Sequence, residues 1–226
     1  MRFRRLLARA LAAVIALAVI YLAAVLTLGL AYRFVTPVST LMLARWATFH
    51  TAARTAVSLD AVAPAAPLAV LASEDARFCL HRGVDWDALR EVVEDDEGPS
   101  RGASTVPMQV AKNLFLWPGR SYLRKALELP IALYLDLVWP KRRMMENYLN
   151  IAEWAPGVFG IEAAARLHFG KSARDLSRQD AALLATALPN PKLRNPGRPS
   201  PRHRNLAGRL LVRMNATAPF AGCLRK

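Results

Sequence analysis

The chain has 226 residues and a formal net charge of +14, from 31 Lys and Arg against 17 Asp and Glu. This length allows a membrane segment and one compact domain with a sizeable core, and leaves little for a second domain. The two cysteines lie far apart without the spacing of metal ligands, so the composition gives no support for a zinc site.

An uncharged apolar stretch of 23 residues, 10–32, lies between Arg9 and Arg33. A helix of that length, at about 1.5 Å rise per residue, spans a bilayer core of about 30 Å. Cleavable signal peptides have apolar cores of about 7 to 15 residues, so we predict a retained transmembrane anchor. Four arginines precede the stretch and one follows closely, which predicts a cytoplasmic N-terminus and an exported remainder.

The segment after the anchor, 34–54, carries scattered apolar residues interrupted by Pro37, and we interpret it as lying along the membrane rather than entering the core. Residues 60–67 are rich in Ala and Pro without a period, which predicts a loop before a first core helix over 68–76. Cys79 stands at a core-like position. A disulfide with Cys223 is allowed outside the cytoplasm, but this position favours a buried thiol. The acidic residues of 91–98, followed by Pro99, predict a mobile solvated loop.

Apolar residues recur at three and four positions over 108–116 and 123–137, which predicts two helices, with Pro130 starting or kinking one of them. Pro140 predicts the start of a further helix through Asn150. A capping box at Ser177 and Asp180 predicts another through Leu188. The strand signal is weak, with at most a hairpin over 154–160, so we expect a mainly α domain.

After Asp180 the chain has cations but no acids, and the exported part as a whole keeps an excess of nine positive charges (31 − 5 − 17). An anionic partner is therefore expected. A tethered exported domain meets lipid headgroups and lipid-linked phosphates. Nucleic acid is not expected, because the C-terminal arginines lie among prolines without interleaved aromatic residues for base stacking.

Polar residues gather in the middle of the chain. Glu74, next to the apolar residues Val70, Leu71 and Phe78, suits a general base or acid, although for a glutamate taken alone an exposed position or a pair with Arg77 is the commoner case. Small and polar residues before and within the 108–116 helix suit an anion site, followed by a group of cations that a solvated surface would also explain; these are Gly102, Ser104, Thr105, Gln109, Lys112, Asn113, Arg120, Arg124 and Lys125. Glu128 shares a helix face with Arg124 and Lys125. We expect a hydrogen-bonded His81 to fix the Glu74 loop, and we expect no metal at His81.

Taken in order, these residues form blocks: Glu74-Asp75-x-x-Phe78-x-x-His81-x-Gly83, Gly102-x-Ser104-Thr105-x-x-x-Gln109-x-x-Lys112-Asn113, Arg124-Lys125-x-x-Glu128, Lys141-x-Arg143-x-x-Glu146-x-Tyr148-x-Asn150 and Gly157-x-Phe159-Gly160-x-Glu162. The ordered set resembles the peptidoglycan glycosyltransferase family, and most closely its monofunctional biosynthetic members. The chain has neither the Ser-x-x-Lys nor the Lys-Thr-Gly element that a transpeptidase domain requires.

The resemblance implies a lysozyme-like catalytic domain with a smaller membrane-proximal lobe, which polymerises lipid II into glycan strands at the bacterial inner membrane, with the catalytic domain in the periplasm. Carried over by position, Glu74 is the general base and Glu128 a second, orienting carboxylate. The implied substrate-binding residues are Ser104, Thr105, Gln109, Lys112, Asn113, Arg120, Arg124, Lys125, Lys141 and Arg143. No cofactor is required, and a divalent cation, Mg or Mn, is allowed. Proteins of cell-wall synthesis or division are candidate partners.

The expected organisation is a cytoplasmic basic tail (1–9), the anchor (10–32), a membrane-proximal linker or lobe (33–67), the glycosyltransferase domain (68–215) and a C-terminal tail (216–226). Two rival functions stay open. A lytic enzyme that cleaves the glycan shares such a fold, but it has no use for several cations beside its acid. A membrane-tethered scaffold without catalytic activity is the other.

Overall fold

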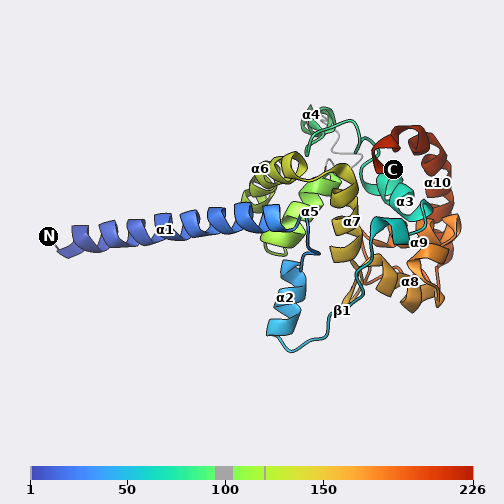
Figure 1. Ribbon diagram of the computed structural model, residues 1–226, viewed down its shortest axis with the longest axis horizontal. Helices are drawn as coiled ribbons and strands as arrows, with labels where there is room; N and C mark the ends of the chain where they lie inside the picture. The colour runs from blue at the N-terminus through green and yellow to red at the C-terminus, as the bar shows by residue number, and fades with distance from the viewer. Residues whose placement is uncertain (1, 95–103, 120, 226) are drawn as a thin grey trace. The chain divides into compact units, whose positions relative to one another are not determined.

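The computed structural model of the protein describes residues 2–94, 104–119 and 121–225. The chain divides into two units, Met1–Val35 and Thr36–Lys226. The first unit holds α1 (Arg2–Ala31), a helix long and apolar enough to cross a membrane (Figure 1). This helix begins eight residues before the apolar stretch, because the arginines, leucines and alanines of the basic tail are strong helix formers.

The second unit begins with α2 (Thr40–Ala47), which was expected to stay outside the core. That expectation is wrong for one face of the helix. Met42 is completely buried, and the Thr40 hydroxyl donates to the carbonyls of Asn113 and Leu116 at 3.2 and 2.8 Å. Other apolar side chains of this helix, such as Leu43 and Trp46, remain exposed.

The first core helix is α3 (Ala65–Glu74), preceded by a short 3₁₀ turn, η1 (Leu59–Ala61). The prediction of a loop over 60–67 is therefore wrong for residues 65–67, which belong to α3. Pro67 lies in the first turn of α3, where a missing N–H is harmless because no helical carbonyl precedes it. The helix ends at Glu74, since the backbone of Asp75 is no longer helical, with φ −160° and ψ 71°.

The acidic segment does not form a loop throughout. Its residues 91–94 belong to the helix α4 (Trp86–Glu94), and 95–98 lie outside the described residues. The predicted central helices are present as α5 (Val106–Phe115), α6 (Tyr122–Val138) and α7 (Lys141–Ile151). Pro130 lies inside α6 rather than at its start.

A small sheet follows α7. The predicted hairpin is confirmed as β2 (Glu153–Ala155) and β3 (Val158–Phe159), which pair antiparallel. No local pattern predicted β1 (Ala53–Arg54), a two-residue strand that pairs parallel with β3. The sheet order is therefore β1-β3-β2. The helix α8 (Ile161–Phe169), which was also not predicted, follows directly.

The C-terminal part completes the core. After the 3₁₀ turn η2 (Ala173–Asp175) comes α9 (Arg178–Ala187), which begins with the predicted capping box of Ser177 and Asp180. The helix α10 (Pro201–Thr217) was missed, because its arginines and the prolines before it were interpreted only as a basic region. Pro201 occupies the first turn and Ser200 caps it. Two short turns follow, η3 (Ala218–Phe220) and η4 (Gly222–Leu224).

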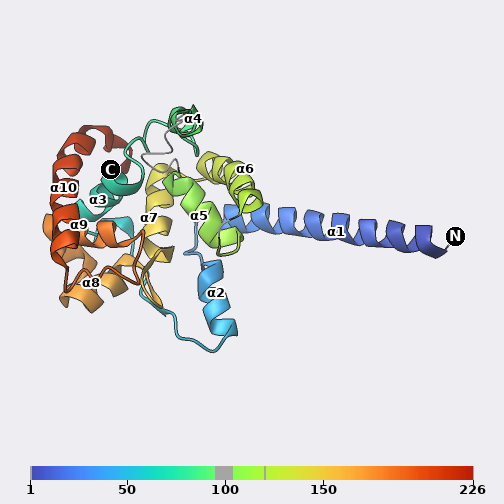
Figure 2. The ribbon, with the colours of Figure 1, turned by 180° about the vertical axis from the view of Figure 1, so that it is seen from behind.

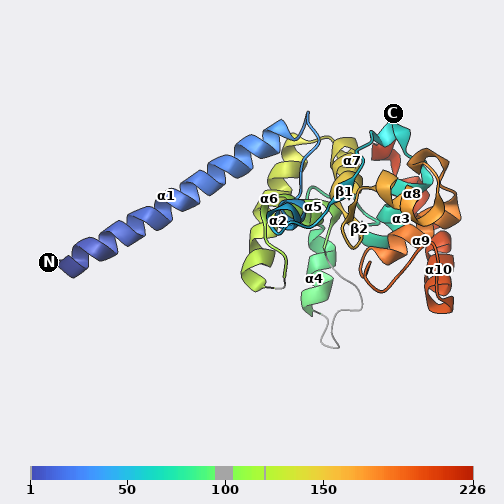
Figure 3. The same ribbon diagram turned by 90° about the horizontal axis from the view of Figure 1, so that it is seen from below.

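Two groups of helices build the second unit. In one group α3, α9 and α10 pack against one another, and in the other α5 packs against α6 and α7. Views from the front, the back and below show both groups (Figures 1, 2 and 3). The predicted mainly α fold is confirmed. The lysozyme-like lobes and the five-part division of the chain remain predictions.

Candidate active site

Glu74 lies at the C-terminal end of α3, half-buried, where it faces α5. The Gln109 amide donates to its Oε2 at 3.0 Å, and the neighbouring Ser73 hydroxyl donates to its Oε1 at 3.1 Å. The Tyr148 hydroxyl, from α7, donates in turn to Gln109 Oε1 at 3.3 Å. Three helices therefore contribute to one hydrogen-bonded chain that ends on the Glu74 carboxylate.

Tyr148 controls the direction of that chain. Its side chain is fully buried, and burial raises the pKa of the phenol, with the negative charges of Glu74 and Asp75 adding to the effect. The hydroxyl therefore keeps its proton and acts as a donor. Because Gln109 must accept with its oxygen, its NH₂ group is left to donate to Glu74. Tyr148 is part of the ordered blocks in the sequence, but no role was predicted for it, so this contact was missed.

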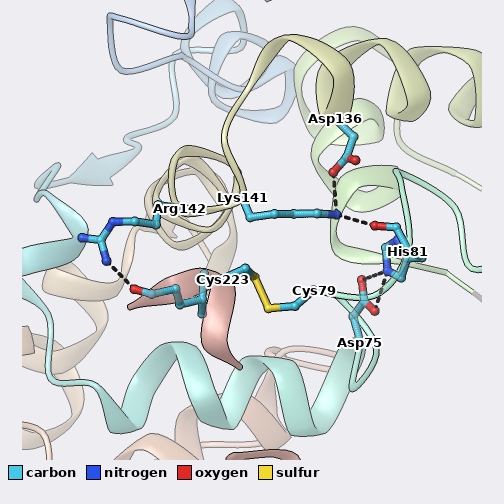
Figure 4. Close-up of a disulfide and its surroundings, with 8 residues drawn as sticks. Asp75, Cys79, His81, Asp136, Lys141, Arg142 and Cys223 are labelled. Atoms are coloured by element: carbon cyan, nitrogen blue, oxygen red, sulfur yellow. Dashed lines mark hydrogen bonds and ion pairs between the residues drawn. A yellow bond between two sulfur atoms is a disulfide. The ribbon is translucent and has the colours of Figure 1, made fainter. Parts of the chain in front are cut away.

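Asp75 fixes the chain that leaves α3. Its carboxylate accepts from the Val106 amide at 2.8 Å and from His81 Nε2 at 2.9 and 3.0 Å. The His81 carbonyl accepts from Lys141 Nζ at 2.8 Å, and Lys141 also pairs with Asp136 at 2.7 Å. Figure 4 shows the contacts of His81 with Asp75 and of Lys141 with His81 and Asp136. The prediction that His81 is hydrogen-bonded and fixes the Glu74 turn is confirmed.

The expectation of a buried thiol at Cys79 is wrong. Cys79 forms a disulfide with Cys223, 144 positions further along, and both residues are only partly buried (Figure 4). The bridge joins the turn after Glu74 to η4. The sequence could not decide this, because nothing local indicated that the C-terminal segment returns to α3.

Thr105 and Ser104 lead into α5. Thr105 is the N-cap of this helix: its hydroxyl accepts from the Met108 amide at 3.3 Å and donates to the Gly83 carbonyl at 2.6 Å. Gly83 has a φ of +74°, and a Cβ there would lie 2.9 Å from the Ala132 carbonyl, so only glycine fits. Ser104 accepts a hydrogen bond from Lys125 Nζ.

A cluster of three cations and one carboxylate lies between α5 and α6. We call Lys112, Arg124, Lys125 and Glu128 the cation cluster. Glu128 is buried, and it pairs with Arg124 Nη1 and, at 3.0 Å, with Lys125 Nζ. The predicted shared face is thus confirmed. One carboxylate does not balance three cations, so the cluster keeps a surplus of positive charge.

The pKa values of two lysines show that the cluster disfavours their charged forms. The pKa of Lys125 is lowered to about 8, first by burial and then by the charges of Arg124 and Lys112. The pKa of Lys112 is lowered first by burial and then by Arg124, while the negative charge of Glu74 acts in the opposite direction. Lys112 has no ion pair with the described residues. An anion that enters here would relieve both lysines.

Other predicted residues lie elsewhere. Lys141 holds the His81 carbonyl and Asp136, and Arg143 pairs with Glu146, whose carboxylate also accepts from the Leu59 amide at 2.8 Å. Both cations are therefore engaged by groups outside the cation cluster. Asn113 is half-buried, and its carbonyl accepts from Thr40. Arg120 and Gly102 lie outside the described residues.

A cavity of about 630 Å³ opens beside Glu74. Its lining includes Glu74, Asp75, Ser104 and Thr105, together with residues from the end of α10 and from η3. A second cavity, of about 660 Å³ around His168 and Arg194, has no lining residue in common with the first. The chemistry gathers at Glu74, so we assign the site to the first cavity.

In the described part of the chain, no group of three or more His, Cys, Asp or Glu side chains is arranged to hold a metal ion. A divalent cation that binds to a substrate diphosphate needs no such group. The allowance for Mg or Mn therefore stays a prediction.

A carboxylate beside cations with surplus charge, on a mainly helical domain behind an apolar helix, defines an enzyme that acts on an anionic substrate. A family model described as Transglycosylase matches residues 42–215. Relatives named biosynthetic peptidoglycan transglycosylase are similar over most of their length. The one from Rhodopseudomonas palustris is 53% identical over 193 residues, 84% of this chain and 81% of the relative. That from Brucella suis is 51% identical over 194 residues, 85% and 87% of the two chains.

A third relative with this name, from Nitrobacter hamburgensis, is 52% identical over 197 residues, which cover 86% of this chain and 87% of the relative. The chain belongs to the transglycosylase family. The resemblance that the ordered polar blocks indicated is thereby confirmed.

Proposed function

We propose that this enzyme is a peptidoglycan glycosyltransferase that polymerises lipid II into glycan strands and releases undecaprenyl diphosphate. The family membership supports the reaction class. The site supports two separate roles, because a base must lie near one sugar while cations bind the diphosphate of another. The observation that carries the proposal is the position of Glu74 beside the positively charged cation cluster.

Glu74 is the general base in this proposal. It removes the proton from the 4-hydroxyl of the acceptor sugar, and that oxygen attacks the anomeric carbon of the growing chain. The bond from that carbon to the diphosphate breaks as the new glycosidic bond forms, so configuration inverts from α to β. The hydrogen bonds from Gln109 and Ser73 hold the carboxylate in one orientation for this transfer.

The cation cluster is the site of the leaving group. Diphosphate is a weak base, so its departure needs charge neutralisation rather than a protonating acid. Lys112 and Arg124 supply that charge, and Lys125 bridges the cluster to Ser104. Arg120 joins them on the strength of the sequence pattern alone.

The remaining roles follow from the contacts. Glu128 orients Arg124 and Lys125 rather than donating a proton, since both its oxygens are engaged by cations. Gln109 positions Glu74, and Thr105 shapes the start of α5. Asn113 is proposed to contact sugar or phosphate. Lys141 and Arg143 shape the fold around the cleft through their own ion pairs.

The same charges favour synthesis over cleavage of the glycan. A lytic enzyme must protonate a sugar leaving group, for which a surplus of cations beside the acid is unfavourable. We further propose that α1 is a single-pass anchor in the bacterial inner membrane, with the N-terminus in the cytoplasm and the catalytic unit in the periplasm. The four arginines before residue 10 support this orientation.

The test is polymerisation of labelled lipid II by the full-length protein, with Glu74→Gln and Glu94→Gln as paired variants. Glu94 is an exposed glutamate at the end of α4 and serves as the matched control. We expect lysozyme-sensitive polymer from the wild type and from Glu94→Gln, and a loss of about 10²-fold or more in Glu74→Gln. Polymer at the wild-type rate from Glu74→Gln would remove Glu74 as the base. Cleavage of preformed glycan without any polymerisation would support the lytic alternative.

A further inference from the structure

One wall of the Glu74 cavity comes from the C-terminal end of the chain. Arg213, Ala216 and Thr217 of α10 and Phe220 of η3 line the same cavity as Glu74 and Ser104. Arg213 and Phe220 are exposed, whereas Thr217 is buried and donates its hydroxyl to the Arg213 carbonyl at 3.0 Å. This wall is therefore an ordered helical turn with a cation on its outer face.

The wall is also attached to the element that carries Glu74. The disulfide ties Cys223, three residues after Phe220, to Cys79, five residues after Glu74. Arg142, from α7, adds a second attachment for the C-terminal segment, because its guanidinium donates to the Leu224 carbonyl and pairs with Asp60 at 2.7 Å. In addition, α10 packs directly against α3. The position of Arg213 relative to Glu74 is thus set by a covalent bond and by core packing.

Charged groups that line this cavity differ in how far they are already engaged. Glu74 and Asp75 accept hydrogen bonds from protein donors, and Arg77 pairs with Asp85 at 3.6 Å and with Asp87 at 2.7 Å. The Arg213 guanidinium, in contrast, has no hydrogen bond or ion pair with any described residue. Among the described residues that line this cavity, Arg213 is therefore the cation available to a ligand.

We propose that Arg213 is a specificity-determining residue that binds an oxyanion of the substrate whose hydroxyl faces Glu74. This inference rests on the proposed function. A transferase that joins two lipid-linked molecules must hold two sets of anionic groups at once. The cation cluster between α5 and α6 serves the leaving diphosphate. It does not line this cavity, whereas Arg213 does and so gives the second molecule a cation of its own.

The oxyanion has two chemical sources in such a substrate, a diphosphate and the carboxylates of a stem peptide. A guanidinium binds either with paired, charge-assisted hydrogen bonds. The two sources can be separated with two substrates, namely lipid II and the same lipid-linked disaccharide without its stem peptide.

The experiment measures KM and kcat for polymerisation by full-length wild type, Arg213→Ala and Arg209→Ala. Arg209 is exposed on the same helix one turn earlier and does not line the cavity, so its variant loses the same charge without the proposed contact. We expect Arg213→Ala to raise KM for lipid II about tenfold or more, with kcat much less affected, as for the loss of a hydrogen bond to a charged group. Arg213→Lys should restore part of the affinity.

A rise in KM with both substrates assigns the contact to the diphosphate, and a rise only with the stem-bearing substrate assigns it to a carboxylate. An unchanged KM, or a change equal to that of Arg209→Ala, would overturn the inference and leave Arg213 a solvated surface charge. A fall in kcat alone would also overturn it. Absence of polymer from the wild type would instead refute the proposed function, and the inference with it. Thermal melts of each variant check that the fold is intact.

Discussion

The two sides of the site are built on opposite principles. Around Glu74 hydrogen bonds hold the carboxylates in place: Gln109 donates to Glu74, Tyr148 orients Gln109, and Asp75 is held by His81 and by the Val106 amide. In the cation cluster the charges are left unbalanced, with the pKa of Lys112 lowered and that of Lys125 lowered to about 8.

This difference follows from what each side is proposed to do. A base acts by position, so hydrogen bonds that fix its orientation before the substrate arrives are useful. A site for a leaving diphosphate acts by charge, and it acts more strongly when the protein has not already neutralised that charge. The contacts around Glu74 are therefore expected to stabilise the fold, whereas the unbalanced charges of the cation cluster are expected to destabilise it. Such a trade-off is common at functional sites.

Lys112→Met gives the largest expected effect on activity. Removal of a desolvated cation from the leaving-group site should lower kcat by about 10²- to 10³-fold, the usual loss for one preorganised electrostatic contact. The free energy of unfolding should stay the same or increase, because the folded protein no longer holds a buried charge beside Arg124. Polymerisation kinetics and urea unfolding of the full-length protein measure the two quantities.

Lys192→Met is the matched control, since Lys192 is exposed and does not line the Glu74 cavity. It should leave both quantities near their wild-type values. A Lys112→Met enzyme with normal kcat, or one that is clearly destabilised, would contradict the contrast between the two sides of the site.

Cys223→Ser tests the opposite side, where stability is expected to come from fixed contacts. Loss of a native disulfide across a loop this long should lower the free energy of unfolding by about 2 to 4 kcal/mol. The cavity wall formed by α10 and η3 would then be held only by α10 packing and by the Arg142 contact. KM should therefore rise about 2- to 5-fold, while kcat changes less. Chemical unfolding and steady-state kinetics provide the measurement.

Three comparisons isolate the disulfide itself. Cys79→Ser, Cys223→Ser and the double variant should behave alike, because each removes the same bond. Wild type treated with a reductant should match them. If the double variant were much less stable than either single variant, packing of the thiols rather than the bridge would account for the effect.

Much of the helical fold could be predicted from local patterns. Apolar spacing gave α5 and α6, Pro140 gave the start of α7, and the capping box at Ser177 gave α9, because periodicity and caps act within a few residues. Those signals fail where an element depends on contacts with a distant part of the chain. The strand β1 is only two residues long and exists through its pairing with Val158 and Phe159.

The same limit applies to the site. Residues on one helix face, such as Arg124 and Glu128, could be placed together from sequence, since their spacing brings them into contact. Tyr148 could not be linked to Gln109 in this way, because the two lie on different helices. The wall around Arg213 depends on how α10 returns to α3 and on the bridge between Cys79 and Cys223. A basic, proline-rich sequence contains no local signal for either.

The smallest expected effect is a dependence on pH that is specific to Lys125. Its pKa of about 8 in the folded protein lies below the ordinary lysine value of 10.5. As pH rises through 8 the folded enzyme loses this cation, so the affinity for the diphosphate substrate should fall about 3- to 10-fold between about pH 7 and about pH 9.5. Lys125→Arg should flatten this part of the profile, because a guanidinium stays charged throughout.

Stability should respond to pH in the opposite direction. Between pH 8 and 10.5 the unfolded chain keeps the Lys125 proton that the folded protein has released, so the unfolded state binds more protons and the free energy of unfolding rises with pH. Lys125→Arg should remove that rise as well. Activity and stability that fell together above pH 8 in the wild type would show that the fold, rather than the charge of Lys125, controls the profile. Opposite trends that both vanish in Lys125→Arg would tie the unbalanced charge directly to substrate binding.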